Sequence, residues 1–421
     1  MAEKRKPLPF MAVLQPEDYG PVLRCMIIRT AMEEDRKWVE NYRFPGEIRA
    51  MFRSDGNGQK NPQGGYVTVF PVSGPEIGWT QGFVYDVKKE RNTYRDLSLP
   101  GLKCTRVICP VLDRFINRKP YTKDGITIRY RDYLPESYRN RKGVRTTRKG
   151  TLPLIIWLHG LGEGGTDPSL VLLGNRVTAL TDVTVQCYFP DTGAAVLAPQ
   201  CPTMWMDADG HSHWNESELE KTGGVSFYTA ALKGLIGKYL QAHPEIDRSR
   251  IYIGGCSNGG YMTIQMILAM PGRFAAAYPI CPAYHAAWMT DARIRKLAKV
   301  PMWITSAATD QTVPLRDKDG KPAYADALYE KLNAYKKNNE NAGPGGASPK
   351  TEPSPQDEND GHSLPDLVYS RLPQVMGFTS KGLPYEYFGH WSWIPVLQDQ
   401  VTKEFDREEV HLFEWMAAKH L

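Results

Sequence analysis

The pentapeptide Gly255-Cys256-Ser257-Asn258-Gly259 constrains this sequence more than any other segment. A β-branched and aromatic run, Arg250 to Ile253, precedes it, and an apolar segment from Tyr261 to Met270 follows it. That order predicts a buried strand, a sharp turn and a buried helix. In such a turn, small residues on both sides of a serine let the strand and the helix pack closely while the hydroxyl points outward. We therefore expect Ser257 to be a nucleophile held in a strained conformation.

A serine hydroxyl becomes reactive when a histidine takes its proton and a carboxylate orients that histidine. In enzymes with this kind of turn, the acid and then the histidine follow the serine, each on a loop after a later strand. The apolar run from Val300 to Thr305 leads into a polar segment that contains Asp310. We predict Asp310 to be the acid. Asp291 and Asp326 are weaker candidates because their segments have helical patterns, and a turn or helix-capping role is the alternative for Asp310.

Nine histidines are present, and His390 has the most suitable surroundings for a base. It directly follows a glycine in a short aromatic segment from Tyr385 to Trp393, as expected for a loop at the edge of a sheet. A histidine packed among core aromatic residues is the alternative. The other histidines after the serine are less suitable. His411 and His420 lie in an expected amphipathic terminal helix from about residue 406, and His362 lies in a polar Pro/Gly-rich segment. His285 comes before the acid in the chain.

Acyl transfer also needs N–H donors aimed at the oxygen that becomes negative. The backbone N–H of Asn258, directly after the serine, is expected to be one donor. The apolar run from Leu152 to Leu158 predicts a central parallel strand, and it ends in a glycine-rich turn from His159 to Gly165. We predict the N–H of Leu161 as the second donor. The turn lacks the Lys-Ser/Thr of a phosphate-binding loop, and no G-x-G-x-x-G opens a helix here, so a nucleotide cofactor is not expected.

Two further motifs accompany the glycine-rich turn and the serine turn: Ala198-Pro199-Gln200-Cys201-Pro202 with Trp205-Met206-Asp207, and Gly389-His390-Trp391-Ser392-Trp393. Together the motifs resemble the feruloyl-esterase-like α/β-hydrolases, which are related to prolyl oligopeptidases and polyhydroxybutyrate depolymerases. The resemblance spans about residues 118 to 421. It implies the roles given above for the serine, the acid, the histidine and the two donors. It also implies a substrate-binding set of Gly160, Gln200, Trp205 and Trp391.

The strand and helix pattern changes near residue 117. Residues 1–117 show short β-type runs between Gly, Asn and Pro turns, with one helix expected near Ala31 to Val39, which predicts a small β-sandwich. Several esterases of the resembled family carry an immunoglobulin-like domain there. Residues 118–421 alternate strands and helices, which predicts a mostly parallel sheet flanked by helices, the α/β-hydrolase fold. Residues 336–366 are Pro-, Gly- and acid-rich and are expected to form a flexible insertion, with a lid as the alternative.

Composition narrows the class of protein. The 421 residues are 41% hydrophobic and 24% charged, which is typical of about two globular domains. No stretch approaches ~18 consecutive apolar residues, so no membrane span is expected. The net charge of +5 is mild, and the basic run from Arg139 to Lys149 lacks interleaved aromatic residues, so no nucleic-acid partner is expected. No apolar segment follows the basic start, so we expect a cytoplasmic protein, or a secreted one whose leader was removed.

The residues that commonly bind metal ions do not occur at the spacing of a known metal-binding motif. The seven cysteines include no zinc motif, at least one is unpaired within a monomer, and Cys256 beside the nucleophile is expected to be a small buried residue. The loop from Asp207 to His213 holds two carboxylates and two imidazoles but fails the calcium-loop spacing. We expect it to be a polar surface loop, and we expect no metal and no cofactor.

The expected function is that of a serine esterase working through an acyl-enzyme. Trp205, Trp391 and Trp393 suit an aromatic acyl group, which makes feruloyl esters of plant polysaccharides the leading substrates, although each tryptophan is equally well explained by packing. The alternatives are a polyester or short-chain carboxylesterase, a prolyl-oligopeptidase-type peptidase, and a carbohydrate-binding protein with an inactive hydrolase domain. The peptidase is disfavoured because the first ~115 residues are too short for a gating propeller. The N-terminal domain is a candidate for homo-oligomer contacts.

Overall fold

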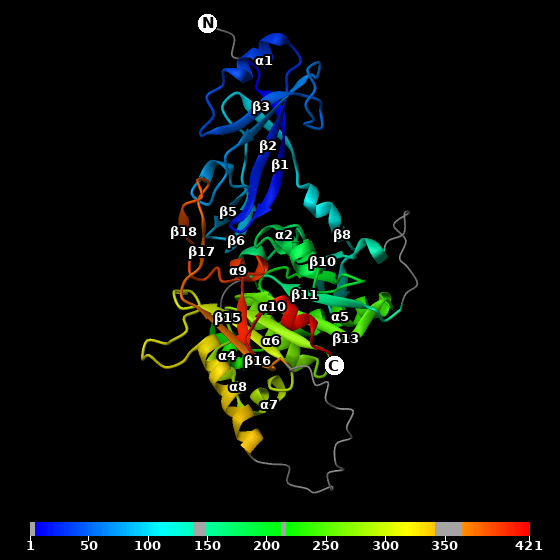
Figure 1. The fold of residues 1–421 in the computed structure, drawn as a ribbon, viewed down its shortest axis with the longest axis vertical. Helices are drawn as coiled ribbons and strands as arrows, with labels where there is room; N and C mark the ends of the chain where they lie inside the picture. Colours follow the sequence, from blue (N-terminus) through cyan, green and yellow to red (C-terminus); the bar gives the residue numbers. More distant parts are fainter. Residues whose placement is uncertain (1–4, 139–148, 212–215, 342–363) are drawn as a thin grey trace. The chain divides into compact units, whose positions relative to one another are not determined.

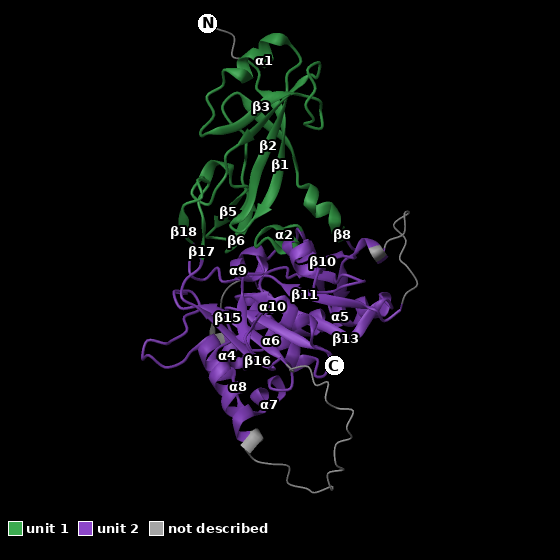
Figure 2. Ribbon diagram, viewed as in Figure 1, with its two compact units in different colours: residues 1–116, 169–178, 376–386 green, residues 117–168, 179–375, 387–421 purple. Residues whose placement is uncertain are grey.

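The computed structural model describes residues 5–138, 149–211, 216–341 and 364–421. The chain divides into two compact units (Figures 1 and 2). The first unit comprises Met1–Ile116, Ser169–Thr178 and Met376–Glu386, and the second comprises Asn117–Pro168, Ala179–Val375 and Tyr387–Leu421. Two short segments that the sequence analysis assigned to the hydrolase domain therefore belong to the first unit.

The first unit is built on a five-stranded sheet of order β3-β4-β2-β1-β7. Its strands are β1 (Leu8–Glu17), β2 (Gly20–Arg29), β3 (Ile48–Ser54), β4 (Tyr66–Pro71) and β7 (Leu102–Ile108). Positions along β1 alternate between buried and half-buried, as in a strand with one face on a core. The unit also contains two small hairpins: β5 (Phe83–Asp86) with β6 (Arg91–Tyr94), and β17 (Met376–Phe378) with β18 (Pro384–Glu386). Its α-helices, in the described residues, are α1 (Glu33–Glu40) and α2 (Leu170–Leu173). An immunoglobulin-like arrangement stays a prediction.

The second unit has the α/β-hydrolase fold. Its nine-stranded sheet has the order β16-β15-β14-β13-β11-β12-β10-β8, and β9 pairs with β10. The strands are β8 (Ile116–Asn117), β9 (Tyr121–Lys123), β10 (Ile126–Tyr133), β11 (Leu152–Leu158), β12 (Ala195–Gln200), β13 (Ile246–Cys256), β14 (Ala276–Ile280), β15 (Met302–Ala307) and β16 (Leu367–Leu372). The six strands β12, β11, β13, β14, β15 and β16 are mutually parallel in that order across the sheet, whereas β10 is antiparallel to β12. The mostly parallel sheet predicted from the sequence is confirmed.

Helices flank this sheet, and the central strands are buried between them. Those described are α3 (Val183–Gln186), α4 (Glu216–Lys221), α5 (Thr229–Ala242), α6 (Asn258–Ala269), α7 (Asp291–Leu297), α8 (Tyr324–Asn341), α9 (Trp393–Leu397) and α10 (Leu412–Ala417). Every position of β11 is buried, and α6 packs on β13 and β14. Within the described ranges, no helix has the length and apolar character needed to cross a membrane.

Two expectations near the C-terminus are corrected. The single terminal helix predicted from about residue 406 is instead a hairpin, β19 (Thr402–Phe405) with β20 (Glu408–His411), followed by α10. Asp406 and Arg407 both have positive φ, 50° and 71°, which is the backbone of a tight hairpin turn rather than a helix. The expected flexible insertion begins later than predicted because α8 continues to Asn341. Its centre, residues 342–363, and most of the basic run at 139–148 lie outside the described residues.

Candidate active site

Ser257 occupies the turn between β13 and α6. Its backbone has φ 55° and ψ −115°, a strained conformation for a residue with a side chain. The N–H of Ser257 donates to the carbonyl of Ile280 at 2.9 Å, and its carbonyl accepts from the N–H of Ala283 at 3.1 Å. The residues on both sides are buried, whereas Ser257 keeps partial exposure. The turn therefore holds one hydroxyl outward from an otherwise closed region.

The two glycines of the pentapeptide allow this turn to exist. A Cβ at position 255 would lie 2.2 Å from the carbonyl oxygen of Leu158, and one at position 259 would lie 2.0 Å from the same atom. Backbone atoms cannot yield at such distances as a flexible side chain would. Only glycine at both positions lets β13 and α6 approach the end of β11.

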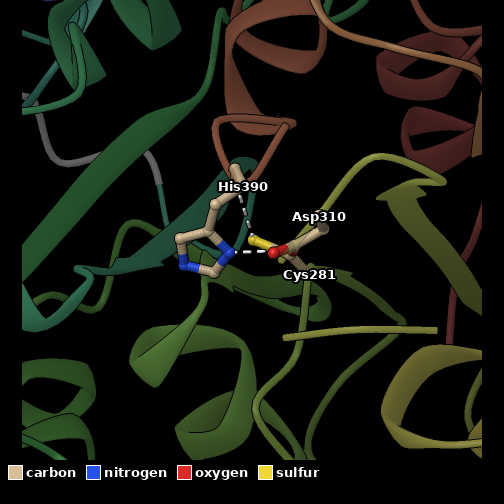
Figure 3. A group of neighbouring side chains, drawn as sticks. All are labelled: Cys281, Asp310 and His390. Atoms are coloured by element: carbon tan, nitrogen blue, oxygen red, sulfur yellow. Dashed lines mark hydrogen bonds and ion pairs between the residues drawn. The ribbon is translucent and has the colours of Figure 1, made fainter. Parts of the chain in front are cut away.

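Asp310 and His390 form a buried hydrogen-bonded pair (Figure 3). Asp310 follows β15, and its Oδ1 accepts the N–H groups of Thr312 and Val313, each at 2.9 Å. The Nδ1–H of His390 donates to the other oxygen, Oδ2, at 2.8 Å. The exposed fractions are 4% for Asp310 and 8% for His390. This pairing fixes which ring nitrogen of His390 carries the proton and leaves Nε2 available to act as a base.

The surroundings of His390 change its basicity. Burial by itself lowers the pKa of the imidazole, but the neighbouring Cys281 and the hydrogen bond and charge of Asp310 outweigh burial. The net effect raises the pKa of His390 above its ordinary value of 6.5. A raised pKa makes the imidazole a stronger acceptor for the proton of a serine hydroxyl.

The parallel order of the strands explains why these groups meet. Ser257, Cys281 and Asp310 follow β13, β14 and β15, which are neighbours in the sheet. The carboxyl ends of parallel strands lie at the same edge, where α/β proteins build their sites. Among the interactions of the described residues, no hydrogen bond joins Ser257 to His390. Such bonds often tighten only when substrate is bound.

The two backbone N–H groups predicted as oxyanion donors lie at helix starts at this edge of the sheet. Asn258 is the first residue of α6, and Leu161 is the first residue of a short 3₁₀ turn, Leu161–Glu163. Neither N–H donates to another group in the part of the chain that the structure describes. The first N–H groups of a helix have no partner within it and carry partial positive charge. Both predicted donors therefore have a free N–H, and their role in holding an oxyanion stays a prediction.

His159 fixes the backbone of the glycine-rich turn, a role that the sequence analysis did not assign. Its Nε2 accepts the N–H of Cys201 at 3.0 Å, so Nδ1 carries the proton and donates to the carbonyl of Gly160 at 2.6 Å. Burial lowers the pKa of His159 to about 4, and the imidazole is neutral at physiological pH. The available signal was a histidine directly after an apolar strand and before the glycines.

Two of the predicted substrate-binding residues are not on an accessible surface. Gln200 and Trp205 are both 0% exposed. The Nε2 of Gln200 donates to the carbonyl of Glu163 at 2.9 Å, and the N–H of Trp205 donates to Oδ1 of Asn258 at 2.6 Å. They brace the donor segments from inside, so the expectation that they line the acyl pocket is corrected. Gly160 is also buried, whereas Trp391 is half-exposed.

Aromatic side chains surround His390. The ring centroid of Phe388 lies 6.4 Å from that of His390, and the centroid of Trp393 lies 5.6 Å from it. Trp391 lies 6.3 Å from Trp393. Phe388 is 48% exposed, whereas Trp393 is buried. An apolar, partly accessible rim therefore stands beside the imidazole.

Potential metal ligands occur in two places: the loop from Asp207 to His213 and the region around His390. Asp207 is buried, and its carboxylate accepts from the N–H groups of Asp209 and Gly210 and from the hydroxyl of Thr203, so it caps its own loop rather than facing solvent. His213 of the same loop lies outside the described residues. In the described chain, the set of metal-type ligand atoms found within 4.8 Å of one another belongs to Cys281, Asp310 and His390. The sequence analysis gave Cys281 no role.

Comparisons with known proteins agree with this architecture. Residues 140–340 match the phospholipase/carboxylesterase family. Over nearly its whole length the chain is similar to the crystal structure of a thermostable esterase, with 21% identity, 99% of this chain and 100% of that chain covered, and a TM-score of 0.62. No curated protein matches the sequence at a significant level.

Two further solved structures are more distant. A ferulic acid esterase has 12% identity, covers 68% of this chain and 94% of its own, and has a TM-score of 0.40. An S-formylglutathione hydrolase from Staphylococcus aureus has 16% identity, covers 72% and 96%, and has a TM-score of 0.39. The match to the thermostable esterase supports the fold, and the class of protein that the fold defines is that of the α/β-hydrolases.

Proposed function

We propose that this protein hydrolyses carboxylic esters through an acyl-enzyme formed on Ser257. The observation that carries the proposal is the outward, strained hydroxyl of Ser257 at the same sheet edge as the buried Asp310–His390 pair. In the first half-reaction, His390 Nε2 takes the hydroxyl proton as Oγ attacks the ester carbonyl carbon. The N–H groups of Leu161 and Asn258 hold the oxygen that becomes negative.

The same imidazole serves both half-reactions. When the tetrahedral intermediate collapses, protonated His390 gives its proton to the leaving alkoxide, and the alcohol departs. A water molecule then gives its proton to His390 and attacks the acyl carbon, and the second collapse returns the proton to Ser257 and releases the acid. Asp310 keeps its charge throughout and stabilises the imidazolium that forms at each step.

The proposed substrates are esters of aromatic acids, with feruloyl esters of plant polysaccharides foremost. The support is the aromatic rim beside His390, formed by exposed Phe388 and half-exposed Trp391. A planar aromatic acyl group gains both apolar burial and ring contacts against such side chains. Because Gln200 and Trp205 are buried, this rim replaces them as the proposed acyl contact.

Hydrolysis of three substrates by four proteins tests the reaction. The substrates are methyl ferulate, a short-chain p-nitrophenyl ester and a proline-containing peptide anilide, and the proteins are the wild type and the variants Ser257→Ala, His390→Ala and Asp310→Asn. We expect ester turnover to fall by about 10³-fold or more in each variant, because removal of any member disables the proton transfer. Cleavage of the anilide alone would favour a peptidase, and full activity in Ser257→Ala would contradict the proposed site.

Specificity is tested at the aromatic rim. Phe388→Ala and Trp391→Ala should lower kcat/KM for methyl ferulate by about tenfold, with a smaller effect on the short-chain ester, because one lost aromatic contact is worth on the order of 1 kcal/mol. Phe378→Ala, an exposed phenylalanine of the first unit, is the matched control and should change neither value. Equal losses on both esters would argue for a short-chain carboxylesterase instead.

A further inference from the structure

Cys281, Asp310 and His390 come together at the carboxyl edge of the sheet from three separate segments (Figure 3). The thiol of Cys281 donates to the carbonyl of His390 at 3.4 Å, and the Nδ1–H of His390 donates to Asp310 at 2.8 Å. The sulfur, one ring nitrogen and one carboxylate oxygen lie within 4.8 Å of one another. All three residues are buried.

These atoms are the ligand types that zinc prefers. Zinc binds a cysteine sulfur at about 2.3 Å, a histidine nitrogen at about 2.0–2.1 Å and a carboxylate oxygen at about 2.0–2.2 Å. In a tetrahedral site such ligand atoms stand about 3.3–3.8 Å apart. The upper limit of 4.8 Å on the separations is close to this range, and the 2.8 Å separation between His390 Nδ1 and Asp310 Oδ2 has to open by about 0.5 Å.

The charges also match a divalent cation. A thiolate and a carboxylate carry two negative charges, and a neutral imidazole adds none, so one Zn²⁺ makes the buried set electrically neutral. An uncompensated charge would be costly at this depth. Binding releases the proton of the Cys281 thiol, while the single proton of the neutral His390 ring moves from Nδ1 to Nε2, so the affinity falls as the pH falls.

The surroundings already hold two of the ligands in place. Oδ1 of Asp310 is fixed by the N–H groups of Thr312 and Val313, which leaves Oδ2 for the cation. The N–H of Cys281 donates to the carbonyl of Thr305 at 2.7 Å, and its positive φ of 35° is a second constraint on the backbone. Hydrogen bonds of this kind orient metal ligands and raise affinity.

We propose that Cys281, Asp310 and His390 form an inhibitory site for zinc or another thiophilic divalent cation. The inference rests on the proposed function for its consequence, because the cation takes the Nδ1 and carboxylate positions that catalysis uses. With the cation on Nδ1, Asp310 no longer orients His390, and the neutral ring carries its proton on Nε2, which then cannot accept the proton of Ser257. Ester hydrolysis stops until a chelator removes the cation.

Direct binding and inhibition are measured together on the full chain. Zinc bound after equilibrium dialysis, and the ultraviolet thiolate-to-metal band on adding cadmium, report the site without using activity. Ester hydrolysis with and without zinc, followed by EDTA, reports inhibition. The wild type should bind one equivalent that Cys281→Ser binds at least about tenfold more weakly, since a serine hydroxyl is a poor zinc ligand. Inhibition should be reversed by EDTA and should weaken to the same extent in Cys281→Ser.

Two controls keep the result decisive. Cys256→Ser and Cys201→Ser remove buried thiols of the same unit that are outside the ligand set, and both should bind zinc as the wild type does. Asp310→Asn removes a ligand without touching a thiol, so it tests the site even where Cys281→Ser fails to fold, and it should also lose the equivalent. Equal zinc binding by wild type, Cys281→Ser and Asp310→Asn would overturn the site. If the protein binds zinc through Cys281 but hydrolyses no ester, the metal site is supported and the proposed function is contradicted.

Discussion

Gly389 allows the loop that carries His390 to pack closely against the loop that carries Asp310. A Cβ at position 389 would lie 2.3 Å from the carbonyl oxygen of Thr309, the residue before Asp310. The loop that carries His390 and the loop that carries the acid therefore touch through their backbones. This close contact sets the 2.8 Å hydrogen bond between the two side chains.

Gly389→Ala should displace the loop and lower kcat/KM for an ester by about 10²-fold, because catalytic geometry is sensitive to shifts on the order of 1 Å. Gly237→Ala is the control, since a Cβ there meets nothing within 4 Å and the position lies in α5. It should leave activity unchanged. Wild-type activity in Gly389→Ala would show that the loop adapts without moving the imidazole.

The raised pKa of His390 predicts the acid limb of the activity profile. The imidazole must be neutral to take the serine proton, so kcat/KM should fall as the pH drops through a midpoint above 6.5. Asp310→Asn removes the charge that holds the proton, and the midpoint of its residual activity should move down. A wild-type midpoint at or below 6.5, measured on an ester without ionisable groups, would contradict this assignment.

The sequence alone predicted Ser257, Asp310 and His390 as a set, because the serine turn is a local pattern and the order of the other two follows from it. Their catalytic roles stay predictions until the variants are measured. Cys281 was missed because it has no motif: it reaches the other two only through the neighbouring positions of β14 and β15 in the sheet. Gln200 and Trp205 were misplaced because a motif does not reveal which side of a loop is covered.

At the scale of elements, His159 links the end of β11 to the segment after β12. It accepts from Cys201 and donates to Gly160, so both connections depend on a neutral ring with one proton. Burial lowers the pKa of His159 to about 4 from 6.5. An unfolded chain therefore binds a proton in a pH range where the folded chain does not.

The contribution of His159 to the free energy of unfolding should decrease as the pH falls from 6.5 towards 4 and should recover when the pH is raised again. The full effect is on the order of 3 kcal/mol, since each pKa unit corresponds to about 1.4 kcal/mol. Denaturant unfolding at several pH values measures it. His159→Gln keeps an acceptor and a donor but does not titrate, so its stability should vary less over this range; an identical pH dependence would remove His159 as the cause.

Continuous apolar runs predicted the central strands because they are buried on both faces, as β11 is. The terminal helix was wrong because the segment before α10 contains a tight turn at Asp406 and Arg407, two residues for which sequence gives no strong turn signal. The start of the insertion was misjudged because a polar composition does not stop a helix that is already packed by its first turns on β15 and β16.

At the scale of the whole molecule, the first unit draws on three separate parts of the chain, yet its core comes from one. The buried cluster contains Leu8, Phe10, Met26, Val69 and Leu102 among others, all within residues 8–102. Segments 169–178 and 376–386 add the buried apolar helix α2 and polar contacts, including Arg176 with Asp18 and the N–H of Ser380 with Glu76, each at 2.9 Å. Sequence could not predict this membership, because it depends on contacts between distant parts of the chain.

A fragment of residues 1–116 should therefore keep its β structure and unfold cooperatively. It should be less stable than the same unit in the full chain by about 1–2 kcal/mol, because it loses the ion pair of Asp18 with Arg176 and the two hydrogen bonds of Glu76 with Ser380. Circular dichroism and hydrogen exchange of β1 and β2 in both proteins measure this. A fragment without a cooperative transition would show that the added segments supply essential packing.

The proposed reaction requires Ser257 to be the residue that becomes acylated. The most direct test is intact mass and peptide mapping after reaction with an activated phosphonate or a slowly turned-over ester. We expect one added group per chain, located on the peptide that contains Ser257, and none in Ser257→Ala. A group on another residue, or full labelling of Ser257→Ala, would contradict it.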